Sequence, residues 1–229
     1  ILENLTNGAA ERGILDKHDH VGYPTFKDWP TYSSLTHQQM YYKWVERAWR
    51  GGQRIMVNDM VSNPGLCPII GIVAGPNRYS CDDMETVRRQ IQATYDVQTF
   101  VDKQYGGTGK GWYRVVKTPQ EAEKVIADGK LAVVLGVEVS EPFGCKQTLG
   151  IANCTKKDID KGLDELKGKG VSSMFLCHKF DNALCGVRYD SDVTGLLVNA
   201  GQFITTGTWW NPQTCKEGQV SDNEVIGGV

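Results

Sequence analysis

The sequence of 229 residues lacks any apolar run close to the roughly 20 residues that a membrane-spanning helix needs, so it predicts no membrane span. Its first residues, I-L-E-N-L-T-N-G, contain neither the basic stretch nor the apolar core of a signal peptide. It also has little net charge, because 25 basic residues stand against 27 acidic ones. Such a balance attracts neither nucleic acid nor anionic lipid at long range, and we expect no nucleic-acid partner.

Motifs for two common kinds of site are also missing. No G-x-G-x-x-G or Walker-type loop follows an apolar run, which disfavours a doubly wound sheet that binds nucleotides. No C-x-x-C pair is present, which disfavours a zinc ribbon. These absences leave a small molecule or a peptide as the expected substrate.

The seven cysteines lie mostly in loops rich in Pro, Asn and Gly, which indicates disulfides. We expect the pairs Cys67–Cys81 and Cys145–Cys154 first, and the odd count leaves one thiol free or bonded to a further segment. Two triplets, beginning at Asn4 and Asn153, have the form of N-glycosylation acceptors. Together these features predict a secreted, disulfide-bonded glycoprotein.

Strand-like and helix-like segments alternate along the chain. From capping boxes and helical spacing, helices are predicted to begin at Thr36, Asp82, Thr118 and about Lys157. The fourth helix is expected to turn Ile159, Leu163 and Leu166 inward. Apolar runs read as strands lie at 13–20, 53–61, 112–116, 130–140, 171–178 and 202–207.

Repeated strand–helix units with nearly continuous apolar strands are typical of a parallel sheet covered by helices. We therefore expect an α/β fold, a single (β/α) TIM-type barrel domain over residues 1–229. Only about six of the eight barrel units are recognisable, and a complete barrel needs about 250 residues. The barrel is thus expected to be incomplete: either a missing segment or a continuation chain supplies the rest, or the barrel is degenerate. A continuation chain or a homo-oligomer is the expected protein partner.

Three of the predicted strands end in side chains that bind metal ions. His18 and His20 end the first strand, Glu138 ends the fourth and His178 ends the fifth. The carboxyl ends of parallel strands meet at one edge, where active sites of such folds lie. Because strand side chains alternate, His18 and His20 point to the same side and can grip one ion. Imidazole and carboxylate ligands suit Zn²⁺, and we expect one or two divalent ions.

Other interpretations of the same residues stay open. Glu138, inside an apolar strand, could instead form a salt bridge with a Lys or Arg, since an unpaired buried charge costs several kcal/mol. Asp181 and Asn182, after the fifth strand, could bind the substrate or close an Asx-type turn. His37, in the first turn of a predicted helix, is expected to lie on the surface without a role.

These residues resemble the amidohydrolase superfamily of metal-dependent hydrolases, which are TIM barrels. The H-x-H at 18–20, the carboxylate at 138 and the His at 178 carry the resemblance, which spans residues 13–186. Glu in place of a carboxylated Lys is similar to the membrane dipeptidase branch, and it implies that Glu138 bridges two ions. The strings G-K-L-A-V-V-L-G-V-E-V-S and H-K-F-D-N-A-L are also similar to bacterial secreted proteins grouped with that family. The family takes a further His and an Asp from later strands, whereas no histidine follows His178 here.

The expected function is a metal-dependent hydrolase, in which metal-activated water attacks an amide, peptide or ester bond. Residues that act beyond the metal ligands are not assigned by the sequence. One alternative is a non-catalytic secreted barrel that serves binding or assembly. A second is a phosphodiesterase of the phospholipase C-like type, which the absence of an Arg beside His18 disfavours.

Overall fold

The computed structural model describes residues 42–65, 67, 80–187 and 192–211. They form two compact units, of which the first contains 42–58 and 92–134 and the second contains the remaining described residues. The predicted strand at 13–20, with His18 and His20, lies outside the described residues, as does His37. The prediction of a single domain stays a prediction.

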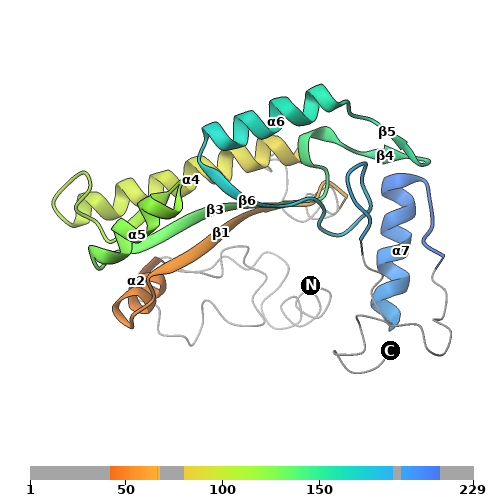
Figure 1. Cartoon of the computed structure of the whole chain (residues 1–229). Helices are drawn as coiled ribbons and strands as arrows, with labels where there is room; N and C mark the ends of the chain where they lie inside the picture. Colours follow the sequence, from red (N-terminus) through yellow and green to blue (C-terminus); the bar gives the residue numbers. More distant parts are fainter. Residues whose placement is uncertain (1–41, 66, 68–79, 188–191, 212–229) are drawn as a thin grey trace, which may run out of the picture. The chain divides into compact units, whose positions relative to one another are not determined.

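The described elements alternate between strands and helices, as Figure 1 shows. In chain order they are α2 (Tyr42–Arg50), β1 (Ile55–Ser62), α4 (Asp83–Gln104), β2 (Tyr113–Val116), α5 (Pro119–Ala127), β3 (Leu131–Val139), the 3-10 turn η1 (Pro142–Gly144), β4 (Gln147–Thr148), β5 (Ile151–Ala152), α6 (Lys156–Gly168), β6 (Val171–Phe175) and α7 (Asp192–Thr206). Among the described helices, none has the length and apolar character to cross a membrane.

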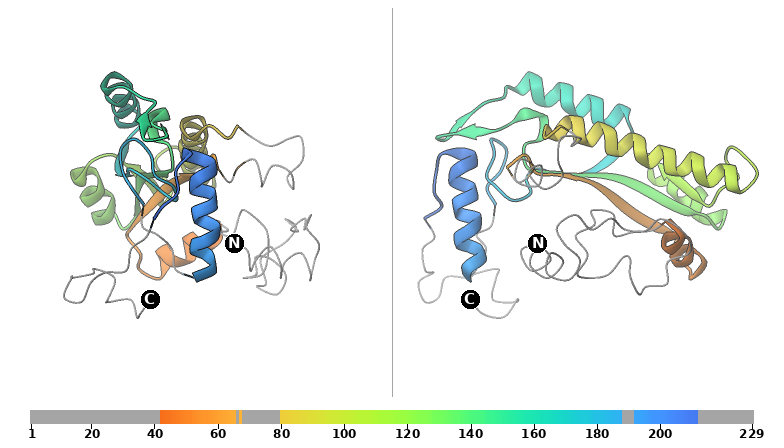
Figure 2. Two further views of the ribbon diagram at one scale, coloured as in Figure 1. Left: turned by 90° about the vertical axis from the view of Figure 1, so that its right-hand side faces the viewer. Right: turned by 180° about the vertical axis from the view of Figure 1, so that it is seen from behind.

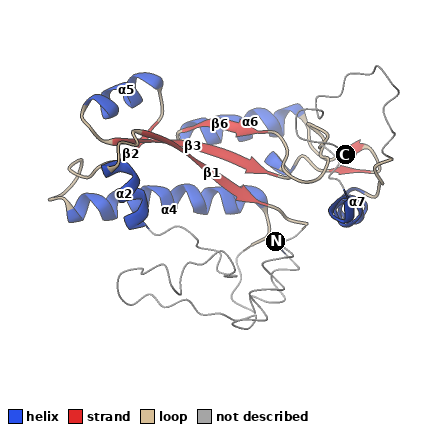
Figure 3. Ribbon diagram, turned by 90° about the horizontal axis from the view of Figure 1, so that it is seen from below, coloured by secondary structure: helices blue, strands red, loops and turns tan. Residues whose placement is uncertain are grey.

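The main sheet corrects the prediction of a TIM-type barrel. It has four strands, with β1 and β2 beside β3, and β6 also pairs with β3. β2 runs parallel to residues 131–134 of β3, and β6 runs parallel to residues 135–138 (Figure 3). No closed barrel forms within the described part of the chain. Apolar strand patterns identify a parallel sheet, but closure depends on strand number and stagger, which these patterns do not encode.

In the first unit, the core forms around two stacked tryptophans. The rings of Trp49 and Trp112 lie 5.2 Å apart at an angle of 12°, and the Trp49 Nε1 donates to the Gly129 carbonyl at 2.8 Å. Trp112 packs with Leu131 and Val133 of β3, both fully buried. These contacts fix the start of β3, the strand that carries Glu138 at its other end.

The same unit buries two carboxylates, those of Glu46 and of Asp102, which pairs with Arg114 at 2.9 Å. Glu46 of α2 is 5% exposed and accepts hydrogen bonds from Lys43, Arg50 and the Tyr105 hydroxyl. Burial alone would raise the pKa of Glu46, but the three hydrogen bonds outweigh it and lower the pKa to about 2.

In the second unit, two helices lie side by side on one face of the sheet. Arg88 of α4 and Glu165 of α6 form a two-bonded ion pair at 2.6 and 2.9 Å, and Figures 1 and 2 show the two helices next to each other there. Phe143, before α6, has a φ of 61°, and its ring lies against Gly162 of α6, where a Cβ would collide with it. The connection from β3 to α6 is therefore tightly packed.

The helix starts predicted at Asp82, Thr118 and about Lys157 are confirmed, whereas one side-chain prediction and one strand prediction are wrong. Thr118 caps α5 by accepting from the Glu121 amide, and Thr155 and Asp158 form the capping box of α6. Leu163 of α6 is 46% exposed, because the buried stripe of that helix passes through Gly162 and Leu166 instead. The run 202–207, predicted as a strand, is the end of helix α7.

Candidate metal-binding site

Glu138 lies near the carboxyl end of β3. Its neighbours Val137 and Val139 are fully buried, whereas the Glu138 side chain is 33% exposed. The strand is apolar on both faces up to this point, with only Val134 and Glu138 partly exposed. Glu138 is thus the position at which the strand opens to solvent, and its partner in the register with β6 is Phe175, which is 56% exposed.

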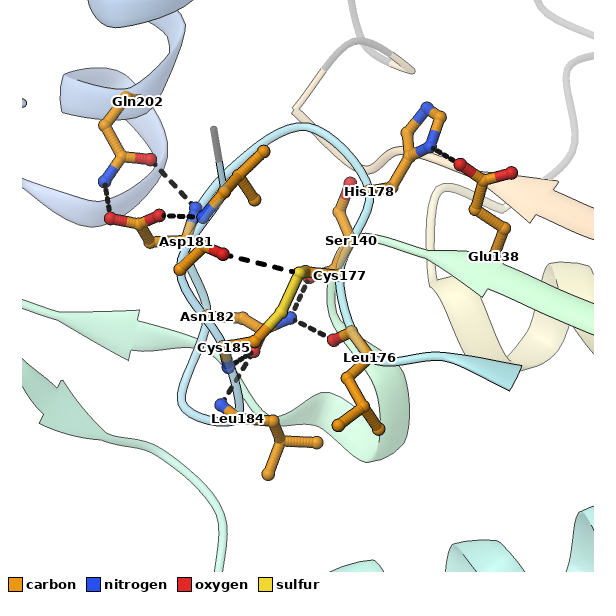
Figure 4. Close-up of a disulfide and its surroundings, with 12 residues drawn as sticks. Glu138, Ser140, Leu176, Cys177, His178, Asp181, Asn182, Leu184, Cys185 and Gln202 are labelled. Atoms are coloured by element: carbon orange, nitrogen blue, oxygen red, sulfur yellow. Dashed lines mark hydrogen bonds and ion pairs between the residues drawn. A yellow bond between two sulfur atoms is a disulfide. The ribbon is translucent and has the colours of Figure 1, made fainter. Parts of the chain in front are cut away.

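His178 follows β6 by three residues and faces Glu138. The His178 Nδ1 lies 2.8 Å from the Glu138 Oε1, as Figure 4 shows. A carboxylate only accepts hydrogen bonds, so Nδ1 donates, and in the neutral imidazole Nε2 then carries the lone pair. A hydrogen bond of this kind from an imidazole to a carboxylate is the usual support of a histidine that binds a metal through its other nitrogen.

A third ionisable side chain, Asp59 of β1, belongs to the same neighbourhood. Asn58 donates to Thr94 of α4 at 2.8 Å and Met60 is buried, so Asp59 between them points to the other face of the sheet. Burial raises the pKa of Asp59, and the negative charge of Glu138 raises it further. The Asp59 Oδ1 is buried and has no hydrogen-bond partner among the described residues.

Two more carboxylates are buried at the ends of these strands. Asp83, the first residue of α4, is 3% exposed and accepts from the Glu141 amide at 2.7 Å. Burial raises the pKa of Asp83 and that of Glu141, although Lys146 at 3.0 Å opposes the shift at Glu141. This end of the second unit is therefore rich in carboxylates, which favours the binding of a cation.

The loop after β6 uses Asp181 and Asn182 for its own hydrogen bonds. The Asp181 Oδ2 accepts from Gln202 at 3.0 Å and from Trp210 at 2.8 Å. The Asn182 side chain, in a residue that is 6% exposed, donates to two carbonyls and accepts from two amides. The alternative of a turn fastened by these side chains is what the geometry supports, and their predicted role in binding substrate stays a prediction.

Disulfides close the loops after three strands. Cys67–Cys81 follows β1, Cys145–Cys154 follows β3 and Cys177–Cys185 follows β6. The first two pairs confirm the sequence-based prediction, and the third was not expected. Three disulfides are consistent with a protein of an oxidising, extracellular environment. The seventh cysteine, Cys215, lies outside the described residues.

Of the four predicted metal ligands, Glu138 and His178 come together, while His18 and His20 are not described. Among the described residues, no group of three or more His, Cys, Asp or Glu side chains is arranged to hold a metal ion. No protein-family model, curated protein or solved structure matches this chain. The chemistry of the site must therefore be argued from its own residues.

Sequence reasoning missed Asp59 and the Cys177–Cys185 bridge. Asp59 lies inside the apolar run I-M-V-N-D-M-V, and a carboxylate within such a run is the signal that singled out Glu138 in β3. The bridge spans the polar turn K-F-D-N-A-L, so the spacing of Cys177 and Cys185 around a turn was its only sign.

Proposed function

We propose that this chain is a secreted metal-dependent hydrolase that cleaves an amide, peptide or ester bond in a small molecule or peptide. The observation that supports it is the contact of Glu138 with His178 at 2.8 Å, between residues that follow neighbouring strands. His18 and His20, two positions apart in the sequence, complete the proposed ligand set.

The donor atoms fit a zinc ion. His178 offers Nε2, because its Nδ1 is turned to Glu138, and the second carboxylate oxygen of Glu138 remains available. Imidazole nitrogen and carboxylate oxygen are common zinc ligands in hydrolases. Either Glu138 binds an ion directly, as the family resemblance implies, or it orients His178 from behind.

The residues around this pair have separable tasks. When bound, a zinc ion would lower the pKa of its coordinated water to about 7 and polarise the carbonyl of the substrate. Asp59, with its raised pKa and its unpaired oxygen, can accept a proton or a hydrogen bond on the same face. Phe175 offers an exposed apolar surface next to Glu138 for the side chain of a substrate.

Metal content and hydrolysis test the proposal together. The purified chain should bind one or two equivalents of zinc by elemental analysis, lose activity on a panel of dipeptides, amides and esters with a chelator, and regain it with zinc. His178→Gln and the double variant His18→Gln/His20→Gln should lose metal and activity. His37→Gln is the matched control, because it removes the one histidine outside the proposed set, and it should change neither.

The opposite result identifies the alternative. A folded protein without zinc, with His178→Gln indistinguishable from the parent chain in all these assays, would refute the hydrolase and favour a binding or assembly module.

A further inference from the structure

We propose that the cross-linked loop 177–185 is the device that positions His178 against Glu138, so that the Cys177–Cys185 disulfide controls the metal affinity of the site. The first test of this inference, the zinc affinity, rests on the proposed function. The second test, which ring nitrogen of His178 carries the proton, does not.

His178 is not held in place by the sheet. β6 ends at Phe175, and no further ladder bond fixes the three residues that follow. Its imidazole must nevertheless stay within 2.8 Å of Glu138, with Nδ1 rather than Nε2 toward the carboxylate. Since an irregular loop samples many backbone conformations, this geometry requires other restraints on the chain at 177–179.

The disulfide supplies the first restraint. It joins Cys177, the residue immediately before His178, to Cys185, eight positions along the chain. Both ends of the loop are therefore fixed relative to each other, and Figure 4 shows the bridge beside the histidine. A covalent closure at the adjacent residue restricts the directions in which the imidazole can point.

Asn182 supplies the second restraint by joining the two segments that carry the pair. Its Nδ2 donates to the Ser140 carbonyl at 2.8 Å and to the Leu176 carbonyl at 2.7 Å. Ser140 is two residues after Glu138, and Leu176 is two residues before His178. The Asn182 side-chain amide thus links the segment after β3, which follows Glu138, to the segment after β6, which precedes His178.

Asn182 is itself held by the bridge. The Asn182 Oδ1 accepts from the backbone amide of Cys185 at 3.0 Å, and the backbone amide of Asn182 donates to the Cys185 carbonyl at 3.0 Å. The preceding residue, Asp181, fastens the loop to α7 because its Oδ2 accepts from Gln202 at 3.0 Å. The disulfide, Asn182 and Asp181 therefore form one connected support, and breaking the bridge releases the residue that ties the two segments together.

The chain offers a matched control for the loss of a disulfide. Cys145–Cys154 also lies in the second unit and closes a loop of nine positions, against eight for Cys177–Cys185. Because the closed loops are almost equal in length, their removal releases nearly the same entropy in the unfolded chain. Only Cys177–Cys185 has an end next to His178 in the chain. Cys145 contacts the same loop through its backbone carbonyl, which accepts from the Ala183 amide at 2.9 Å and remains in the serine variant, so a difference between the two double variants reports positioning rather than general stability.

The experiment compares Cys177→Ser/Cys185→Ser with Cys145→Ser/Cys154→Ser. Zinc affinity is measured by competition with a chromophoric chelator, and the ring nitrogens of ¹⁵N-histidine are observed by NMR, with His178→Gln to assign the signal. We expect the first variant to bind zinc about 10–100-fold more weakly, the range for loss of a support behind a metal ligand. Its His178 should show a mixture of tautomers in place of a single Nδ1-protonated form. The second variant should keep the affinity and the tautomer of the parent.

Each other outcome overturns the inference or separates it from the proposed function. Equal effects of the two double variants, or no change at His178 in the first, would refute the positioning role. If the parent binds no zinc, the hydrolase proposal fails and the tautomer comparison alone decides. If the first variant does not fold, Asp181→Asn takes its place, because it keeps the bridge and replaces one acceptor by an NH₂. Both carboxylate oxygens of Asp181 accept hydrogen bonds, Oδ2 from Gln202 and Trp210 and Oδ1 from the Val187 amide, so either orientation of the Asn amide sets its NH₂ against a donor. Unchanged tautomer and affinity in that variant would also refute the inference.

Discussion

Replacing Asn182 by Ala tests whether this side chain is structural or binds substrate. In the fold it donates to the carbonyls of Ser140 and Leu176 and accepts from the amides of Leu184 and Cys185, all within 3.0 Å. Each such bond contributes about 1 kcal/mol net, so four correspond to about 4 kcal/mol. Because the partly buried amides can regain water, we expect a loss of about 3 kcal/mol in the free energy of unfolding.

The assay is urea unfolding followed by tryptophan fluorescence, with Asn153→Ala as the control. Asn153 is exposed and makes one side-chain hydrogen bond, to Thr148 at 3.1 Å, so its loss should cost less than about 0.5 kcal/mol. Asn182→Asp should be at least as destabilising as the alanine variant at pH 7, because a carboxylate then faces two carbonyl oxygens. A stability equal to that of the control, with only a raised KM, would refute the structural role and return Asn182 to the substrate site.

Three further predictions concern the rest of the chain. Glu46→Gln should destabilise the protein by up to about 3 kcal/mol at pH 7, since the pKa of Glu46 falls from 4.5 to about 2 on folding; the difference from the parent in urea titrations should shrink as the pH falls from about 5 to 2, and a constant difference contradicts it. Gly201→Ala should lower the melting temperature despite the better helix propensity of Ala, because the new Cβ would lie 2.7 Å from the Phe180 ring; Phe180→Leu in the same chain should reverse the sign. Secreted from a eukaryotic cell, the chain should carry a glycan on the exposed Asn153, removable by a glycosidase; Thr155→Asp should keep the helix cap and lose the glycan, Thr155→Ser should keep both, and a glycan on the Asp variant would refute the assignment.

The sequence predicted best those features that depend on a few neighbouring residues. The caps predicted at Asp82 and Thr118 satisfy amides three positions away, so each pair of partners lies within four residues of the sequence. The disulfide Cys145–Cys154 closes a short loop for the same reason. The pairing of Glu138 with His178 was also foreseeable, because strand ends of a parallel sheet share one edge and both residues follow apolar runs.

Features that depend on distant packing were predicted wrongly. The run Q-F-I-T-T-G has the β-branched residues of a strand, yet Gln202 and Thr206 are almost fully buried on one side of α7, and the Thr206 hydroxyl donates to the Gln202 carbonyl one helical turn earlier. Leu163 was placed inward by its apolar character, but the packing of Phe143 on Gly162 turns the helix so that Leu163 faces solvent. In both cases a contact partner lies outside the local sequence window, namely Asp181 for Gln202 and Phe143 for Gly162.

The wrong prediction of a barrel has a different cause. It came from the number of repeated strand–helix units in the sequence, not from the assignment of any single strand or helix. β2 and β6 each pair with a different half of β3 on a parallel register, and a pattern of apolar strands contains no information about which strands become neighbours. The contact between Glu138 and His178 did not depend on closure. It required only that the ends of β3 and β6 be adjacent, which the described sheet provides, whereas the contribution of His18 and His20 to the site stays a prediction.

Buried polar atoms and disulfides occur in the same part of the second unit, and their energies are comparable. The Asp59 Oδ1, the Asp83 Oδ1 and the Ser140 Oγ are buried without a hydrogen-bond partner among the described residues, and each such atom costs about 1–3 kcal/mol. Each of the three disulfides closes a loop of 8–14 positions, which corresponds to about 2.5–3 kcal/mol in the chain-entropy model. The cross-links thus offset the cost of the polar groups at the strand ends. A sheet edge optimised for stability alone would replace those carboxylates with apolar side chains, so their presence in the unit that contains Glu138 and His178 agrees with the proposed function.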